Sequence, residues 1–233
     1  MIGVNTVSDA SIASAVKRLE AGDLVAFPTE TVYGLGADAT NATAVAQIFA
    51  VKQRPKFNPL ISHLASRDAA FELGAETPIA TALANKFWPG PITLILHRNT
   101  ACPVAMLATA GLEKIGLRVP AHKSAQMLLQ AFGKPVAAPS ANLSGQISPS
   151  TADHVIRSLG KNVEFVLDGG PCESGLESTI IDCTGKAATL IRPGGVTRDA
   201  IASALAEAGL DPAITIAKPL GDNCDPIAPG QLT

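Results

Sequence analysis

Apolar residues recur at helical spacing in several segments that begin with a capping residue. The first segment runs from Ser8, which can cap a helix, to Ala21, just before the helix-ending Gly22. A second helix is expected to start at Asn41 or Thr43 and to end before Pro55. The same signals predict helices over residues 66–73, 78–88, 120–132, 151–159 and 197–208.

Short apolar runs separate these helices and predict buried strands. The runs are Leu24–Phe27, Leu60–Leu64, Ile92–Leu96, Ile115–Arg118, Pro135–Ala138, Glu164–Leu167, Thr179–Asp182 and Thr189–Ile191. Residues Pro28–Asn41, rich in Thr and Gly, predict a loop. Because strands and helices interleave, the pattern favours an α/β fold with an open, twisted, mixed β-sheet flanked by helices. We expect one main domain over residues 1–212 and an extension over 213–233, where Pro, Gly and Asp become frequent.

Composition narrows the class of protein. The chain has 233 residues, of which 47% are hydrophobic and 16% charged, with a mean hydropathy of +0.26. These values exclude a disordered chain. No apolar run has the roughly 18 residues that a membrane helix needs, and no secretory signal is visible after Met1. The four cysteines are too widely spaced for a zinc site or a disulfide framework, so we expect reduced thiols and a cytoplasmic protein.

The distribution of charges along the chain is more informative about possible ligands than the net charge of −2. Residues 39–67 and residues 114–152 contain several Lys and Arg side chains and no Asp or Glu. Two separate acid-free segments predict one electropositive surface, which would attract an anion such as a phosphate.

Polar loops follow several of the predicted strands, where open α/β sheets bind their ligands. These loops are Pro28-Thr-Glu-Thr-Val-Tyr-Gly-Leu-Gly36, Lys52-Gln-Arg-Pro-Lys-Phe-Asn58, Ala138-Pro-Ser-Ala-Asn-Leu-Ser-Gly145, Gly175-Leu-Glu-Ser-Thr179 and Ile191-Arg-Pro-Gly-Gly195. We expect them to meet at one ligand site.

Each candidate residue in these loops also has a structural interpretation. Lys52 and Arg54 could bind a phosphate, or could be the solvated cationic end of a helix. Ser140 and Asn142 could contact phosphate, ribose or metal-bound water, or could cap turns. His63 could exchange a hydrogen bond with a ligand, or could be a satisfied core histidine.

Common nucleotide and hydrolase signatures are missing. The chain has no G-x-x-x-x-G-K-[ST] phosphate loop, no G-x-G-x-x-G, no H-E-x-x-H and no G-x-S-x-G elbow. Residue patterns alone therefore predict an anion-binding, nucleotide-binding α/β protein without naming its reaction.

The loops nevertheless resemble those of the YrdC/Sua5 family. The resemblance includes Trp88-Pro-Gly-Pro-Ile-Thr93, Gly116-Leu-Arg-Val-Pro120 and Glu177-Ser-Thr-Ile180 and runs collinearly from about residue 8 to 210. It implies a YrdC-like catalytic domain that makes threonylcarbamoyl-AMP and pyrophosphate from L-threonine, bicarbonate (or CO2) and ATP. It further implies that a downstream transferase machinery places the threonylcarbamoyl group on tRNA to form t6A.

The resemblance also implies roles for individual residues. ATP would be bound by Arg54, Asn58, Ser140, Asn142, Ser148 and Arg192, with Lys52 beside the triphosphate. Threonine or its carbamate would be held by Thr31, His63, Arg118, Ala138 and Ser178. Lys52 and Arg54 carry the expected catalytic role, no protein metal site is expected, and Mg2+ would arrive bound to ATP. Joining two anions needs charge neutralisation more than a protein nucleophile, so we expect no covalent intermediate.

Two further expectations concern the C-terminal segment and the alternative functions. Ala228-Pro-Gly-Gln-Leu-Thr233 resembles the start of the linker that precedes the second domain of longer Sua5 proteins, which implies a truncated two-domain chain. The alternative functions are an RNA-binding module without catalysis, which could accept a duplex or tRNA, and a carbamoyl-transfer domain related to hydrogenase maturation.

Overall fold

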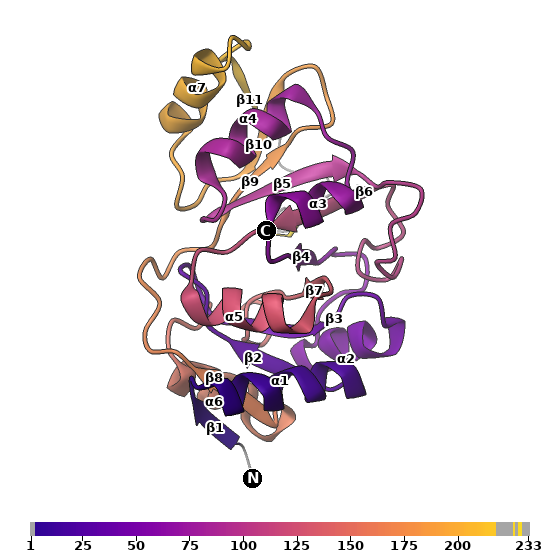
Figure 1. The fold of residues 1–233 in the computed structure, drawn as a ribbon, viewed down its shortest axis with the longest axis vertical. Helices are drawn as coiled ribbons and strands as arrows, with labels where there is room; N and C mark the ends of the chain where they lie inside the picture. Colours follow the sequence, from indigo (N-terminus) through magenta and orange to yellow (C-terminus); the bar gives the residue numbers. More distant parts are fainter. Residues whose placement is uncertain (1–2, 218–225, 227, 230–233) are drawn as a thin grey trace.

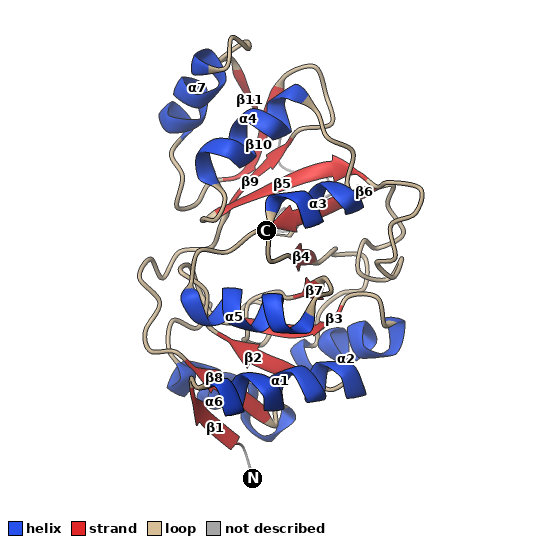
Figure 2. Ribbon diagram, viewed as in Figure 1, coloured by secondary structure: helices blue, strands red, loops and turns tan. Residues whose placement is uncertain are grey.

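An eleven-stranded mixed sheet runs through the described part of the chain, in the order β1-β8-β2-β3-β7-β4-β6-β5-β9-β10-β11. The structure is a computed structural model that describes residues 3–217, 226, 228 and 229. Figure 1 shows the strands stacked along the long axis, and Figure 2 shows helices on the face of the sheet nearest the viewer. The α/β class and mixed sheet predicted from the sequence are confirmed.

The strands are short and pair in both directions. Their bounds are β1 Gly3–Thr6, β2 Val25–Phe27, β3 Gly34–Asp38, β4 Ile61–His63, β5 Ile92–His97, β6 Lys114–Arg118, β7 Val136–Ala137, β8 Phe165–Asp168, β9 Thr179–Asp182, β10 Ala188–Arg192 and β11 Ile214–Ile216. The central strand β4 runs parallel to β6 and antiparallel to β7. This arrangement brings the end of β6 and the loop after β7 to the two sides of β4.

The helices begin at the caps that the sequence indicates. Their bounds are α1 Asp9–Ala21, α2 Ala42–Lys52, α3 Arg67–Leu73, α4 Pro78–Phe87, α5 Lys123–Phe132, α6 Ala152–Leu159 and α7 Arg198–Glu207. Ser8 forms a capping box with Ser11, and Gly22 ends α1 in the left-handed conformation, φ 87°. Asn41 caps α2 through the amides of Thr43 and Ala44. A short 3₁₀ helix, Gly160–Asn162, follows α6.

The predicted loop over Pro28–Asn41 is wrong in its second half, which forms β3. Its Gly-Leu-Gly-Ala-Asp sequence lacks the β-branched residues that usually signal a strand. A side chain at Gly36 would come within 2.8 Å of the Phe27 ring and 2.9 Å of Val136. The glycine is therefore needed because neighbouring strands β2 and β7 carry large side chains at this point.

Two edge strands were also absent from the prediction. β1 pairs in parallel with β8, and β11 pairs in parallel with β10. The sheet thus continues past residue 212, after which the sequence predicts an extension. Residues 218–225, 227 and 230–233, including most of the segment that resembles a linker, lie outside the described residues.

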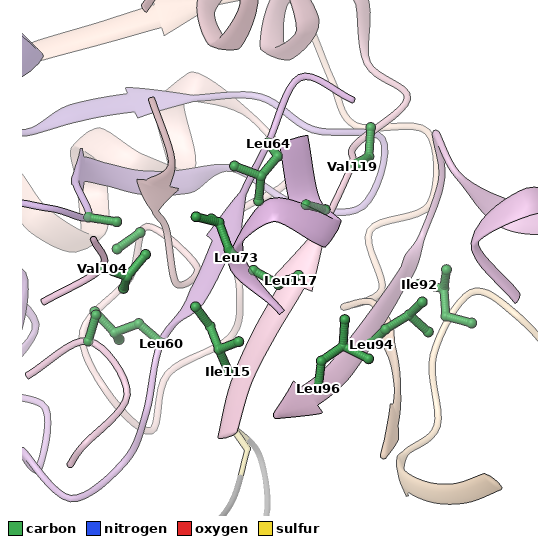
Figure 3. Packing of buried hydrophobic residues seen from close by; sticks show 14 of the residues in the cluster. Leu60, Leu64, Leu73, Ile92, Leu94, Leu96, Val104, Ile115, Leu117 and Val119 are labelled. Carbon is green, nitrogen blue, oxygen red and sulfur yellow. The ribbon is translucent and has the colours of Figure 1, made fainter. Parts of the chain in front are cut away.

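Aliphatic residues build the core between the sheet and its helices, as the low aromatic content requires. Figure 3 shows Leu94 and Leu96 of β5 and Leu117 of β6 packed near Leu73 of α3. Leu94, Leu96 and Leu117 are fully buried. This packing fixes β5 and β6, and β6 ends at Arg118, a predicted site residue.

Candidate functional site

One cavity of about 360 Å³ opens where the predicted polar loops meet. Every residue to which the sequence analysis assigns a substrate contact lines it: Thr31, Lys52, Arg54, Asn58, His63, Arg118, Ala138, Ser140, Asn142, Ser148, Ser178 and Arg192. Residues distant in the sequence are thus gathered around one space large enough for a small-molecule ligand.

Lys52 ends helix α2 and is only 1% exposed. Its Nζ donates to the carbonyl oxygens of Ser140 and Asn142, each at 2.5 Å, and lies 3.5 Å from Asn142 Oδ1. Burial, with the nearby positive charge of Arg54, lowers the pKa of Lys52 to about 7. The solvated helix end that the sequence also allowed is therefore excluded for Lys52.

Arg54 lies on the same wall and is tied to the following loop. Its Nη2 donates to Asn58 Oδ1 at 2.6 Å and to the Pro59 carbonyl at 3.0 Å, while Nε donates to the Asn58 carbonyl at 3.2 Å. Burial lowers the pKa of Arg54 to about 10, so the guanidinium stays charged at neutral pH. Among the described residues, its Nη1 has no hydrogen-bond partner and is available to an anion.

The loop after β7 supplies polar groups opposite these two cations. Asn142 donates from Nδ2 to the carbonyls of Leu143 at 3.0 Å and Gln146 at 2.7 Å. This is the turn-capping role that the sequence left open for Asn142, and it closes the loop that brings Ser148 to the cavity. Ser140 is half-buried, and its carbonyl is held by Lys52.

Glu177 is a cavity residue that the sequence analysis did not assign to the site. Ser148 donates to its Oε1 at 2.8 Å, and Arg192 Nη1 forms an ion pair with Oε2. Burial alone would raise the pKa of Glu177, but Arg192 and hydrogen bonds from Ser148 and Ser140 lower it. Its position in the Glu177-Ser-Thr-Ile180 motif was the available signal.

Besides Glu177, Arg192 binds Ser178, the residue just before β9. Its Nη2 donates to the Ser178 carbonyl at 2.9 Å and to Ser178 Oγ at 3.2 Å. Ser178 Oγ also lies 2.8 Å from Thr93 Oγ1 of β5, and both hydroxyls are buried. Arg192 therefore fixes the loop before β9 against the end of β10.

The cavity is also lined by His63 and Arg118, which lie on the neighbouring strands β4 and β6. The Nδ1 atom of His63 is buried and has no hydrogen-bond partner among the described residues. Burial, with the charge of Arg118, lowers the pKa of His63 to about 3, so its ring is neutral. The unpaired Nδ1 favours a ligand contact over a fully satisfied core histidine, and the ring could exchange a hydrogen bond with a ligand.

Thr31 and Ala138 complete the set of predicted threonine contacts that line the cavity. Thr31 is fully buried, and its hydroxyl lies 2.8 Å from the hydroxyl of Thr29. The Ala138 amide donates to the Ile61 carbonyl at 3.0 Å, which holds the start of the loop after β7 against β4.

The electrostatic balance of the cavity favours anions. Four basic side chains line it, namely Lys52, Arg54, Arg118 and Arg192, against the single carboxylate of Glu177 among the described residues. No group of three or more His, Cys, Asp or Glu side chains in the described part of the chain could hold a metal ion. These basic side chains would attract the anionic groups of a ligand.

No helix in the described part of the chain is long and apolar enough to cross a membrane. Cys102, Cys172 and Cys183 are free thiols, while Cys224 lies outside the described residues.

Comparison with known proteins places these features in a family. The Sua5/YciO/YrdC family model, described as "Telomere recombination", matches residues 17–194. Threonylcarbamoyl-AMP synthase of Bacillus subtilis is 44% identical over 228 residues, which are 97% of this chain and 64% of the relative. The enzyme of the same name from Pyrococcus abyssi is 43% identical over 209 residues, 89% of this chain and 61% of the relative.

A solved structure extends the similarity to three dimensions. The crystal structure of P. abyssi Sua5 complexed with L-threonine superposes with a TM-score of 0.90 at 41% identity, covering 99% of this chain and 67% of that one. This chain spans somewhat less than two thirds of the length of each of the two synthases from Bacillus subtilis and Pyrococcus abyssi.

Proposed function

This chain belongs to the Sua5/YciO/YrdC family, and we propose that it is a threonylcarbamoyl-AMP synthase. It would condense L-threonine, bicarbonate (or CO2) and ATP into threonylcarbamoyl-AMP and pyrophosphate. The observation that carries the proposal is the cavity itself, which gathers the basic side chains of Lys52, Arg54, Arg118 and Arg192 around one space. The similarity to named synthases over most of the chain supports the same reaction.

The reaction joins an amino acid to a nucleotide through two bond-forming steps. The neutral amine of threonine attacks the carbon of CO2, loses a proton and becomes a carbamate. An oxygen of the carbamate then attacks the α-phosphorus of ATP, and the bond to pyrophosphate breaks. Both partners are anions in the second step, so their approach requires cations on both sides.

The residues of the cavity meet this requirement without a protein nucleophile. Arg118 would pair with the threonine carboxylate, and Thr31, His63, Ala138 and Ser178 would surround the rest of the amino acid. Arg54, Asn58, Ser140, Ser148 and Arg192 would contact ATP. Lys52 would place its charge near the triphosphate while its hydrogen bonds hold Ser140 and Asn142 in place.

Mg2+ fits this site as an ion that enters with ATP. Magnesium in nucleotide sites is usually held by phosphates, waters and one or two carboxylates. Because both oxygens of Glu177 are already bound by Ser148 and Arg192, the phosphates of ATP and waters would hold most of the ion. When bound, the ion would neutralise charge on the departing pyrophosphate.

The product would serve tRNA modification, as the donor of the threonylcarbamoyl group of t6A to a downstream transferase machinery. The comparisons support the synthase and do not support the alternative of an RNA-binding module without catalysis.

The test is product formation from labelled bicarbonate. With ATP, Mg2+ and threonine, we expect labelled threonylcarbamoyl-AMP and equimolar pyrophosphate, both dependent on threonine. Lys52→Ala should abolish both products, whereas Lys17→Ala, a lysine on the exposed face of α1, should leave them unchanged. Pyrophosphate release without threonine, or a labelled adenylyl- or threonyl-enzyme adduct, would contradict the proposed reaction or its direct course.

A further inference from the structure

A buried carboxylate lies behind the wall of the cavity, next to Arg118. Glu30 is 8% exposed and does not line the cavity itself. Its Oε1 accepts from Arg118 Nη2 at 2.7 Å, and its Oε2 accepts from the Ala121 amide at 3.0 Å. Both oxygens therefore have a partner, one a side chain of the site and the other a backbone amide.

The Arg118–Glu30 pair is the most buried ion pair among the described residues, with side-chain exposures of 5% and 10%. A pair of this kind adds little to stability on average, because desolvation offsets the attraction between the charges. An apolar pair could fill the same space, so stability alone does not account for two charges at this place. The pair lies instead where one partner faces a ligand cavity.

Glu30 determines how the guanidinium of Arg118 is presented. The guanidinium is planar, so fixing one of its terminal nitrogens also fixes the direction of the other N–H groups. Glu30 holds Nη2, and Nε faces the Gly90 carbonyl at 3.4 Å. Nη1 has no hydrogen-bond partner among the described residues, which leaves it available to an anion in the cavity.

The backbone that carries Glu30 is itself rigid. The hydroxyl of Thr29 donates to the Val32 carbonyl at 2.7 Å and accepts from the amides of Thr31 and Val32, each at 3.2 Å. The Glu30 carbonyl accepts from the Ser174 amide at 3.0 Å. This turn holds Glu30 beside Arg118, and it also connects to the loop that leads to Glu177 and Ser178.

We propose that Glu30 is a positioning residue for substrate binding, which orients Arg118 toward the carboxylate of the amino-acid substrate without touching that substrate. The inference rests on the proposed function for the identity of the amino acid, threonine. It predicts that Glu30 controls the affinity for threonine and leaves the affinity for ATP unaffected.

The variant Glu30→Gln keeps the size of the side chain and removes its charge. An amide cannot accept from both Arg118 and Ala121, since one of its two terminal atoms is a donor. We expect the KM for threonine and its calorimetric Kd to rise at least tenfold. The KM for ATP should stay within about twofold. Such a split separates a positioning role from a general loss of structure.

Two further variants complete the design. Glu30→Asp restores the charge on a shorter side chain and should recover part of the threonine affinity, which keeps the inference testable if Glu30→Gln does not fold. Glu164→Gln makes the same chemical change in the exposed Arg18–Glu164 pair, where the glutamate side chain is 75% exposed, and should leave both KM values unchanged.

The outcomes are distinguishable. Folded Glu30→Gln that binds threonine as tightly as the wild type would overturn the inference. An equal rise in both KM values would also overturn it, since that pattern indicates a structural role only. If the wild-type protein binds no threonine, the proposed function is overturned, and with it the substrate assumed in this inference. This failure is visible in the wild-type measurement alone, without any variant.

Discussion

Lys52, at the end of α2, donates a hydrogen bond of 2.5 Å to the backbone carbonyl of Asn142, in the loop after β7. The two residues are 90 positions apart in the sequence. The contact makes Lys52 both a charge in the cavity and the support of its opposite loop. The protonation state of Lys52 responds to charges bound nearby, because its pKa of about 7 lies near physiological pH.

This pKa predicts that ATP binding takes up a proton at alkaline pH. At pH 8.5 most Lys52 side chains are neutral in the free protein, whereas a bound triphosphate favours the ammonium form and raises the pKa. Up to one proton should therefore bind with each ATP. Calorimetry in buffers of different ionisation enthalpy measures this number directly.

Lys52→Arg provides the control for proton uptake, because arginine stays protonated throughout this range. Its ATP binding should show no proton uptake at pH 8.5. Binding heats of the wild type that do not vary with the buffer would contradict the prediction.

The neutral His63 predicts a pH dependence of stability. Its folded-state pKa of about 3 lies below the ordinary 6.5, so the unfolded chain binds an extra proton as the pH falls through 6.5. The contribution of His63 to stability is therefore complete above that pH and is lost below it. Between pH 7.5 and 5, the wild type should lose about 2 kcal/mol of unfolding free energy through this group.

His63→Phe removes the titrating ring and should flatten the stability profile over this pH range. It also removes the unpartnered Nδ1, so unfolding free energy at pH 5 should exceed that of the wild type. Threonine binding should weaken at the same time. Urea unfolding at both pH values measures the stability, with His154→Gln on the exposed face of α6 as the control for loss of a histidine. If the unfolding free energies of wild type and His63→Phe changed with pH in parallel, His63 would not be a buried neutral ring with a lowered pKa.

Asn142 tests whether the loop after β7 must be closed for ATP binding. Asn142→Ala removes the hydrogen bonds to the Leu143 and Gln146 carbonyls. We expect a loss of about 1–3 kcal/mol of stability and a higher KM for ATP, with the KM for threonine little changed. Gln130→Ala, on the exposed face of α5, is the matched control, because it also removes one side-chain amide. An unchanged KM for ATP would show that the loop keeps its shape without Asn142.

Much of this fold could be predicted from local signals in the sequence. Ser8, Asn41 and Gly22 mark helix ends because capping depends on a few neighbouring residues. β3 could not be predicted in this way. Gly36 is required there by Phe27 and Val136 on neighbouring strands, and only the folded sheet brings Val136 close.

The candidate site, like the fold, could be predicted from the sequence only in part. Family motifs pointed to residues such as Arg54 and Arg118, and all the assigned residues line one cavity. Glu30 and Glu177 lay within those motifs but could not be assigned, because their importance depends on partners in other segments. Glu30 pairs with a residue 88 positions away, and carboxylates are not expected in a site that binds anions.

Gly194 provides the last prediction, because it keeps space for the backbone that carries Ser178. A Cβ atom at Gly194 would lie 2.3 Å from the Glu177 carbonyl oxygen and 2.4 Å from the Thr179 amide nitrogen. Neither backbone atom can move without displacing the hydrogen bonds between Arg192 and the Ser178 carbonyl. Gly194→Ala should therefore lower product formation at least tenfold and lower the thermal midpoint, whereas Gly185→Ala, whose nearest contact would be an ordinary 3.6 Å, should change neither. Wild-type turnover in Gly194→Ala would mean that the loop before β9 can shift without harm, and that the Arg192–Ser178 contact does not position the site.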